Sequence, residues 1–350
     1  MAEENWHDLL TQAPIMTSAP CRIDMGGTLD ISTFYFPLRH LNPVTFNLAV
    51  ALRTKVCLKP FEPGWVKISS RGFEDAVFVI DEVPFRHPMG LMFAVAAHFR
   101  ADGVHIEIDS ASPIRSALGG SSVAAVALIT AFARLRERLG IKRFSRKDTA
   151  LLAHSLEQSV AGIPCGLQDM LAAAFGGAYV WQWTGQPGRT FYTKRKVVKA
   201  KSYKHFERSL LLAYCGAPHE SVDINGRWVR QFLAGKFRSH WAEIVQMTHN
   251  FVDSLRDGDY IRAGQAMNRE VDLRCEMTPE VLDDIGRQLV TKARKEGCGA
   301  RFTGAGGGGC IWALGRPEHI ENLRPSWQSI VEGKPEACLL DITIDPYGVL

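Results

Sequence analysis

One run of small and hydroxyl residues has the composition of a phosphate-binding loop, from Pro113 to Ser122 (P-I-R-S-A-L-G-G-S-S). Small residues let backbone N–H groups approach an anion closely, and a helix starting after the loop would point its positive end at the same place. Ser121 and Ser122 could add hydroxyl groups to a phosphate or to Mg²⁺. The alternative is that Gly119-Gly120 is a plain turn and one serine only caps the helix. The run lacks the G-x-x-x-x-G-K-[ST] pattern, so it is not a Walker loop.

A second candidate site is the glycine-rich segment from Thr303 to Cys310, with five glycines in six residues. Its letters contain G-x-G-x-x-G, but a strand is expected after it, whereas a dinucleotide-binding loop opens a helix. So many glycines carry an entropic cost that a simple hairpin turn does not require. The segment therefore favours a loop whose backbone passes close to a ligand.

Two carboxylates form a third candidate site. Glu157 lies on an expected helix, and Gly162-Ile163-Pro164 breaks that helix before Asp169 opens a short one. Such a pair suits metal chelation by one group and proton abstraction by the other. The alternative is that Glu157 is a solvated helix residue and that Asp169 only complements a helix dipole.

The fourth candidate is the segment from Arg22 to Asp30 (R-I-D-M-G-G-T-L-D). An arginine and two acids around a glycine turn could bind a polyol, because carboxylates accept hydrogen bonds from hydroxyl groups. Turns rich in Gly and Asp are also common for local reasons, so this segment alone is weak evidence.

Alternation and turn residues predict the elements that must position these segments. Since strands and helices do not alternate as regular βαβ units, the order favours an α+β fold. Residues 184–209 are polar, basic and turn-rich, so we place two domains at 1–189 and 190–350. Residues 1–17 are expected to be a loosely attached leader. Strands are expected at about 21–25, 46–58, 104–109, 178–183, 209–214, 300–303 and 310–314, and helices at 121–139, 145–160, 168–174 and most of 225–295.

The composition narrows the function classes. The 350 residues are 46% hydrophobic and 22% charged, which excludes collagen, coiled coil and extensive disorder. The net charge of +4 is more typical of a protein that binds small anions than of a nucleic-acid or membrane binder. The chain starts without a secretory signal pattern, and its longest apolar stretch, about 123–133, is too short to span a bilayer. We therefore expect a cytoplasmic protein whose eight scattered cysteines are free thiols.

Taken together and in this order, the four segments resemble the GHMP kinases, the family of galactokinase, homoserine kinase, mevalonate kinase and phosphomevalonate kinase. Residues 19–24 (A-P-C-R-I-D) resemble the first family motif, and 113–122 resemble the phosphate loop P-x-x-x-G-L-G-S-S. Arg301-Phe302-Thr303 and the following glycines resemble the third motif. Glu157 and residues 162–169 match the galactokinase-type segment in spacing. The resemblance covers residues 19–314.

The resemblance implies a two-domain α+β fold, with an N-terminal domain like ribosomal protein S5, a ferredoxin-like C-terminal domain, and ATP between them. Asp169 would take the proton of the acceptor hydroxyl, and Arg22 would stabilise charge on the transferring group and tune Asp169. Ser121, Ser122 and Glu157 would hold Mg²⁺. The residues implied at the ATP phosphates are Pro113, Ser116, Leu118, Gly119, Gly120, Ser121 and Ser122.

The acceptor is less well defined. The galactokinase motif G-E-H-T-D is replaced by Gly26-Gly27-Thr28-Leu29-Asp30, which more closely resembles the heptose-phosphate kinase and fucokinase-like branch. Asp30 falls one residue nearer to Arg22 than in those relatives, which puts its role at the sugar in question. His219 and Asp223, which follow an expected strand, are further candidates. The residues predicted to bind the acceptor are Asp24, Thr28, Asp30, His219, Asp223, Gly304, Ala305, Gly306 and Gly307.

Two basic features remain open. In the phosphate loop Arg115 and Ala117 stand where the family has small glycines, and Arg115 either contacts a phosphate or points into solvent. The basic run 194–208 is interpreted as a solvated ribbon between domains rather than a nucleic-acid site, and it could also attract a phosphorylated sugar.

The sequence thus predicts an ATP- and Mg²⁺-dependent kinase acting on a hydroxyl of a sugar or sugar phosphate, such as a heptose 7-phosphate, a deoxyhexose or a hexose. A mevalonate-pathway kinase is the nearer alternative, favoured by Leu29 near the acceptor site. A non-catalytic sensor of ATP and sugar is the second, although it has no use for both Glu157 and Asp169. We expect no nucleic-acid or membrane partner, and a monomer or homodimer.

Overall fold

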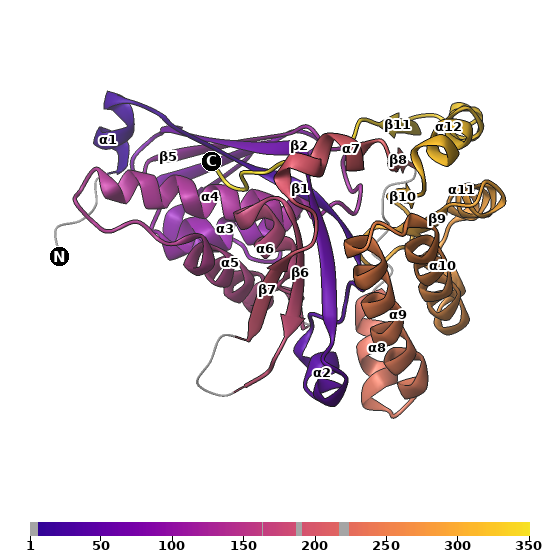
Figure 1. Ribbon diagram of the computed structural model, residues 1–350. Helices are drawn as coiled ribbons and strands as arrows, with labels where there is room; N and C mark the ends of the chain where they lie inside the picture. The colour runs from indigo at the N-terminus through magenta and orange to yellow at the C-terminus, as the bar shows by residue number, and fades with distance from the viewer. Residues whose placement is uncertain (1–5, 163, 187–190, 217–223) are drawn as a thin grey trace.

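The computed structural model describes residues 6–162, 164–186, 191–216 and 224–350 of the chain. Its first half is built on a seven-stranded sheet of order β4-β3-β5-β2-β6-β7, with β1 paired to β2 outside this path (Figure 1). All pairings are antiparallel except β3 with β5. The strands are β1 (Ile15–Met25), β2 (Val44–Pro60), β3 (Trp65–Ser70), β4 (Ala76–Val79), β5 (Val104–Ser110), β6 (Ala178–Trp183) and β7 (Tyr192–Lys196).

The long strand β2 organises this sheet. On one side it pairs with the whole of β1, and on the other its two ends pair with β5 and β6. The expected strands 21–25 and 46–58 are therefore confirmed and are longer than predicted. The helices of this half are α1 (Trp6–Gln12), α2 (Ser32–Tyr35), α3 (Gly90–His98), α4 (Gly120–Glu137), α5 (Arg146–Ala161) and α6 (Gln168–Phe175), with 3₁₀ turns η1 (Arg39–Leu41) and η2 (Ile80–Glu82).

Two of these helices begin as the sequence predicts. Gly119 precedes α4 with φ of 84°, a left-handed conformation that glycine adopts without strain. At α5 the Ser145 side chain accepts from the Asp148 backbone N–H, while the Asp148 side chain accepts from the Ser145 N–H, which completes the capping box. These starts place Ser122 and Glu157 on neighbouring helices.

The expectation of a loose leader over residues 1–17 is wrong for its described part. Helix α1 buries Trp6 and Leu10, four residues apart on one helix face, and β1 already begins at Ile15. The Trp6 indole donates to the carbonyl of Arg100 at 2.8 Å. Seven residues are too few to show a helical period in the sequence, so this helix was missed.

The second half is built on a four-stranded antiparallel sheet of order β11-β8-β10-β9 (Figure 1). Its strands are β8 (Leu210–Tyr214), β9 (Gly299–Phe302), β10 (Cys310–Leu314) and β11 (Cys338–Leu340). The helices of this half are α7 (Tyr203–Glu207), α8 (Ile224–Leu233), α9 (Arg238–Arg256), α10 (Tyr260–Met277), α11 (Asp284–Lys295) and α12 (Pro317–Glu332), with 3₁₀ turns η3 (Ala200–Ser202) and η4 (Pro279–Val281).

Two sheets with helices packed on them, without regular βαβ alternation, confirm the α+β class. The segment 184–209 contains β7, which pairs with β6 in the first sheet. The chain also returns to this sheet at its end, where Leu350 and Ser18 exchange backbone hydrogen bonds of 2.8 and 2.9 Å. A domain boundary at residue 190 stays a prediction. No helix within the described residues is long and apolar enough to cross a membrane.

Candidate active site

A cavity of about 710 Å³ gathers residues from all four segments that the sequence singled out. The segment from Arg22 to Asp30 contributes Arg22, Thr28 and Asp30, and the glycine-rich segment contributes Gly304 and Ala305. The remaining walls come from the phosphate loop and from the segment that carries the paired carboxylates. The predicted site residues that line it, besides those five, are Pro113, Ser116, Gly119, Gly120, Ser121, Ser122, Glu157 and Asp169.

Arg22 and Asp169 form a bidentate ion pair at the cavity wall. Arg22 Nε and Nη2 donate to Asp169 Oδ1 and Oδ2 at 2.8 and 3.0 Å, and Arg22 Nη1 donates to the carbonyl of Ala117 at 2.7 Å. Burial alone would lower the pKa of Arg22, but the carboxylates of Asp169 and Asp24 outweigh it and raise that pKa. A guanidinium beside an aspartate stabilises the ionised aspartate, which is the form that can accept a proton.

The phosphate loop lies directly against this pair. A Cβ added at Gly119 would come within 3.2 Å of Asp169 Oδ2, so this glycine lets the loop approach the carboxylate. Arg115 and Ala117 adopt positive φ angles of 53° and 59°, although neither is glycine. Leu118 does not line the cavity: its side chain is buried in the core, and its carbonyl accepts from the Arg22 N–H at 3.2 Å.

Ser122 and Glu157 meet across the α4–α5 contact. Ser122 Oγ donates to Glu157 Oε1 at 3.0 Å. Burial, the neighbouring Asp169 charge and the more distant Asp30 charge raise the pKa of Glu157 to about 7, against the opposing effect of the Ser122 hydrogen bond. A carboxylate held near other acids gains from a cation placed among them.

Asp30 lies beside the start of α6, the helix that also carries Asp169. Its Oδ2 accepts from the Gln168 backbone N–H at 2.9 Å, whereas its Oδ1 is buried without a hydrogen-bond partner among the described residues. Burial raises the pKa of Asp30 to about 7, and the Asp169 and Asp24 charges add to the rise. Gly166 must be glycine here, since a Cβ would come within 1.9 Å of Asp30 Oδ2.

Three predicted acceptor residues lie away from the cavity. Asp24 is fully buried in a network with Arg22, Arg301 and the Gly304 N–H, so protein groups already occupy the carboxylate. Gly306 and Gly307 lie against η4, where the Gly307 N–H donates to the Val281 carbonyl at 2.9 Å. The predicted contact of these three residues with an acceptor stays a prediction, because none of them lines the cavity. His219 and Asp223 lie outside the described residues.

Comparison with protein families identifies this arrangement. The family model for the N-terminal domain of GHMP kinases matches residues 88–177, which include the phosphate loop and both carboxylates. The model for the C-terminal domain of GHMP kinases matches residues 251–332, which include the glycine-rich segment.

The chain belongs to the GHMP kinase family.

Relatives and solved structures agree with this assignment. A mevalonate kinase of Thermococcus onnurineus is 25% identical over 341 residues, spanning 88% of this chain and 91% of that protein. The galactokinase of Lactococcus lactis, solved with galactose, superposes with a TM-score of 0.73 at 16% identity over 99% and 98% of the two chains. A D-glycero-D-manno-heptose 1-phosphate kinase from Bacteroides thetaiotaomicron gives 0.71 at 17% identity over 96% and 97%. The GHMP homologues are phosphotransferases, and this chain is a kinase of sugar or mevalonate type.

The donor set also fits the divalent ion that GHMP kinases imply. Within the described residues no group of three or more His, Cys, Asp or Glu side chains forms a metal site by itself. Mg²⁺ is usually held by one or two carboxylates together with substrate phosphates and water. Glu157 and Ser122, which are hydrogen-bonded beside the phosphate loop, would supply the protein part of such a site.

Sequence reasoning missed several residues of the GHMP kinase cavity. Asn225, at the start of α8, accepts from the Thr28 hydroxyl at 3.3 Å and lines the cavity. Gln168 lines it as well, and its side chain accepts from Asn47 at 2.9 Å. The position of Gln168 directly before Asp169 could have drawn attention to it, whereas Asn225 has no motif around it. On the phosphate-loop side of the same cavity, the further lining residues are Thr54, Ser70, Arg71, Phe73, Met89, Leu91, Met92, Ile108, Ser110, Ser112 and Ile114.

Proposed function

We propose that this GHMP kinase transfers the γ-phosphoryl group of MgATP to a hydroxyl of a sugar or sugar phosphate, of heptose, hexose or deoxyhexose type. The observation that carries the proposal is the arrangement around Asp169. This carboxylate lines the cavity, is paired with Arg22, lies against the phosphate loop and shares the cavity with Asp30. A proton acceptor, a phosphate site and a second hydroxyl acceptor thus share one cavity.

The chain's own groups would act as follows. Asp169 holds the acceptor hydroxyl and takes its proton, while Arg22 fixes the orientation of that carboxylate and offers positive charge beside the transferring group. The backbone of the phosphate loop and the start of α4 bind the nucleotide phosphates. Ser122 and Glu157 would hold Mg²⁺, which neutralises phosphate charge when it is bound.

The acceptor wall favours a polyol. Thr28, Asp30, Asn225 and Gln168 line it, and these side chains bind hydroxyl groups by accepting or donating hydrogen bonds. Asp30 lines the cavity, and a carboxylate there would accept a hydrogen bond from an acceptor hydroxyl. Leu29 does not support a mevalonate acceptor, since its side chain is buried in the second hydrophobic cluster and does not line the cavity.

A mevalonate-type acceptor remains the second candidate, because a mevalonate kinase matches nearly the whole chain in sequence. ADP release from MgATP separates the two candidates when it is measured with heptose 7-phosphate, heptose 1-phosphate, fucose, galactose, mannose, mevalonate and homoserine. Turnover with a sugar well above the ATPase background supports the proposal, and turnover with mevalonate alone contradicts it. If no acceptor is phosphorylated although MgATP still binds, the result would favour a sensor of ATP and sugar.

Replacing Asp169 tests the catalytic assignment. We expect Asp169→Asn to lower kcat by about 10³-fold, within the usual range for loss of a general base, because the amide does not accept the proton. Binding of a non-hydrolysable MgATP analogue, measured by calorimetry, should change by less than about threefold. Asp109→Asn, at an exposed position on β5, is the matched control. Equal losses of turnover and nucleotide affinity would show that Asp169 is structural.

A further inference from the structure

A row of alternating acidic and basic side chains leads from the catalytic pair into the second half of the molecule. Beyond Asp169 and Arg22 it continues through Asp24 and Arg301, both with fully buried side chains, to a pair on α10. The contacts in sequence are Arg22 Nη1 to Asp24 Oδ1 at 3.7 Å, Asp24 Oδ2 to Arg301 Nη1 at 3.0 Å, Arg301 Nε to Glu270 Oε2 at 2.9 Å, and Glu270 Oε1 to Arg274 Nε at 2.9 Å.

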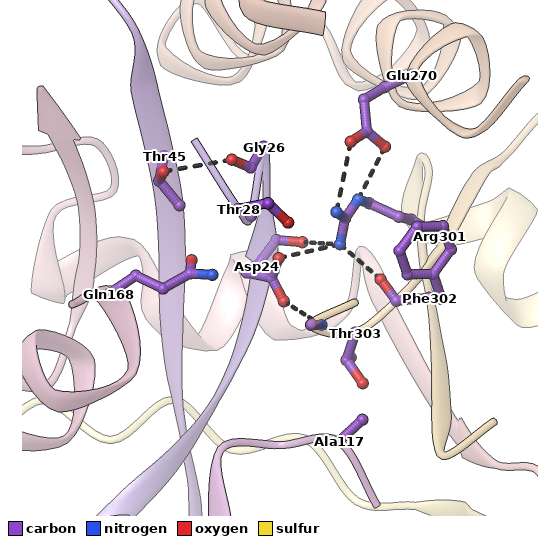
Figure 2. Close-up of polar contacts among 12 residues, drawn as sticks. Asp24, Gly26, Thr28, Thr45, Ala117, Gln168, Glu270, Arg301, Phe302 and Thr303 are labelled. Carbon is purple, nitrogen blue, oxygen red and sulfur yellow. Dashed lines mark hydrogen bonds and ion pairs between the residues drawn. The ribbon is translucent and has the colours of Figure 1, made fainter. Parts of the chain in front are cut away.

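Figure 2 shows the middle of this row, with Arg301 between Asp24 and Glu270. The six side chains (Asp169, Arg22, Asp24, Arg301, Glu270 and Arg274) alternate in sign, and their three carboxylates and three guanidinium groups cancel. Burial alone would raise the pKa of Glu270, but Arg301 and Arg274 lower it below its ordinary value. The formal charges of the row therefore balance.

The far end of the row returns to the cavity. Arg274 Nη2 donates to the carbonyl of Gly27 at 2.6 Å, and the guanidinium lies against the rings of Trp228 and Trp241 at 4.6 and 4.7 Å. Gly27 belongs to the turn of residues 26–30, called here the acceptor turn, which carries Thr28 and Asp30 to the cavity wall. One end of the row thus holds Asp169, and the other holds the acceptor turn.

Asp24 also ties the glycine-rich segment to the row. Its Oδ1 accepts from the Gly304 N–H at 2.8 Å, and its backbone carbonyl accepts from the Trp312 indole at 3.2 Å. A buried ion row adds little net stability compared with apolar side chains of similar volume. The row contacts three parts of one cavity: the Arg22–Asp169 pair, the acceptor turn and the glycine-rich segment. These contacts indicate that the row fixes the relative positions of the three parts, since small misplacements of reacting groups lower the rate by large factors.

We propose that Asp24, Arg301, Glu270 and Arg274 are positioning residues, which fix the Arg22–Asp169 pair relative to the acceptor turn. The proposal rests on the kinase function proposed above. It predicts that breaking the row lowers kcat much more than it weakens nucleotide binding, because the phosphate loop also packs against Gly309 and continues into α4, outside the row.

A charge-balanced double variant tests the proposal without leaving a lone buried charge. Glu270→Gln with Arg274→Met removes one charge of each sign and the bond to Gly27. We expect kcat to fall by at least about 30-fold and KM for MgATP to change by less than about threefold. The matched control is Lys292→Met with Glu296→Gln, which removes an ion pair of the same spacing from α11, where both side chains are partly exposed.

A second variant breaks the row at another link. Asp24→Asn with Arg301→Gln keeps the Glu270–Arg274 pair and the Arg22–Asp169 pair, so it is also balanced. If the first double variant does not fold, this second variant tests the proposal instead. A folded variant of either kind, judged by circular dichroism and melting temperature, that keeps kcat within about twofold of the parent would overturn the proposal.

A readout that needs no acceptor separates this proposal from the kinase function. In protein labelled with ¹⁵N-arginine, the Arg22 Nε–H resonance should shift in both row variants and stay in place in the control. If the parent phosphorylates no acceptor but the resonance shifts, the proposed function fails and the positioning role stands. If the parent is active and neither kcat nor the resonance responds, the positioning role is excluded.

Discussion

At the scale of single residues, Asp30 gives the protein a pH-dependent stability. Its pKa is raised to about 7 by burial, whereas an unfolded aspartate titrates near 4. The folded protein therefore holds this proton between about pH 4 and 7 while the unfolded chain releases it, so stability falls as pH rises through that window. Above about pH 7 Asp30 is ionised in the folded protein, and the full free-energy cost of burying its charge lowers the stability.

Asp30→Asn should remove this dependence, because an amide does not titrate. We expect the free energy of unfolding of the ligand-free parent, relative to the variant, to fall by a few kcal/mol from pH 5 to pH 8. Urea titrations at several pH values measure the difference, and Asp109→Asn should follow the parent. A parent and an Asp30 variant with parallel pH profiles would contradict the raised pKa.

Arg115 offers a second prediction at this scale. Its exposed side chain lines the cavity within the phosphate loop and has no hydrogen bond or ion pair with any described residue. A cation in that place should contact a nucleotide phosphate. We expect Arg115→Ala to raise KM for MgATP by about 3- to 10-fold, the value of one exposed charge-assisted hydrogen bond, with kcat less affected. Arg86→Ala, exposed and outside the cavity, is the control, and an unchanged KM would show that Arg115 faces solvent.

The residues that sequence alone identified share a simple property: they lie in motifs short enough to recognise. Arg22, Ser122 and the pair Glu157 and Asp169 come from three separate segments, and the family resemblance predicted that they would meet. The true contacts of Asp24 could not be predicted, because its partner Arg301 lies 277 residues away and the choice between cavity and core depends on tertiary packing. A buried salt bridge and a substrate ligand require the same residue types.

At the scale of elements, hydrophobic periodicity and capping residues predicted the helices and strands whose signals lie in nearby residues. The capping box at Ser145 and the strand at 178–183 were found as expected, because their signals lie within a few residues. The strand β7 was hidden in the basic run, since Lys194, Arg195 and Lys196 are exposed on an edge strand and give no apolar alternation. Its pairing with β6 is a tertiary effect that the run does not encode.

The two glycine-bearing loops must pack against each other to form the site, and Gly309 tests this contact. Its φ is 84°, and a Cβ would come within 2.7 Å of the Ser116 carbonyl and 2.8 Å of Ala117 Cβ. We expect Gly309→Ala to destabilise the protein by about 2–4 kcal/mol and to raise KM for MgATP, because the phosphate loop must move.

Gly258→Ala is the matched control for this loop contact. Gly258 has a similar φ of 77°, but a Cβ there meets nothing within 4 Å. Only the conformational cost of about 1–2 kcal/mol should therefore appear, without a change in KM. If the two variants behaved alike in thermal melts and in nucleotide kinetics, the contact between the two loops would contribute nothing to the phosphate site.

At the scale of the whole molecule, the two halves share a hydrophobic cluster. Alternate residues of the second sheet face opposite ways: Leu212 and Trp312 join the large cluster of the first half, while Leu211 and Ile311 join a second cluster with α11 and α12. Phe251 of α9 reaches Phe46 of β2 at a centroid distance of 5.4 Å. The second sheet thus has a different cluster on each face: one face joins the core of the first half, and the other packs with the helices of the second half.

This shared cluster predicts that the halves unfold together, although the chain folds into two sheets. Domains with small polar interfaces unfold independently, whereas a continuous apolar cluster couples them. In urea, circular dichroism and tryptophan fluorescence should follow one transition, and amide protons of β2 and β10 should lose protection at the same denaturant concentration. Trp327 gives an internal check. It lies in the second cluster, and its indole donates a hydrogen bond to the Leu289 carbonyl. Trp327→Phe should therefore shift the midpoint of unfolding without splitting the transition. Two plateaus, with β10 exchanging before β2, would show that the second half is an independent folding unit and that the shared cluster does not couple the two sheets.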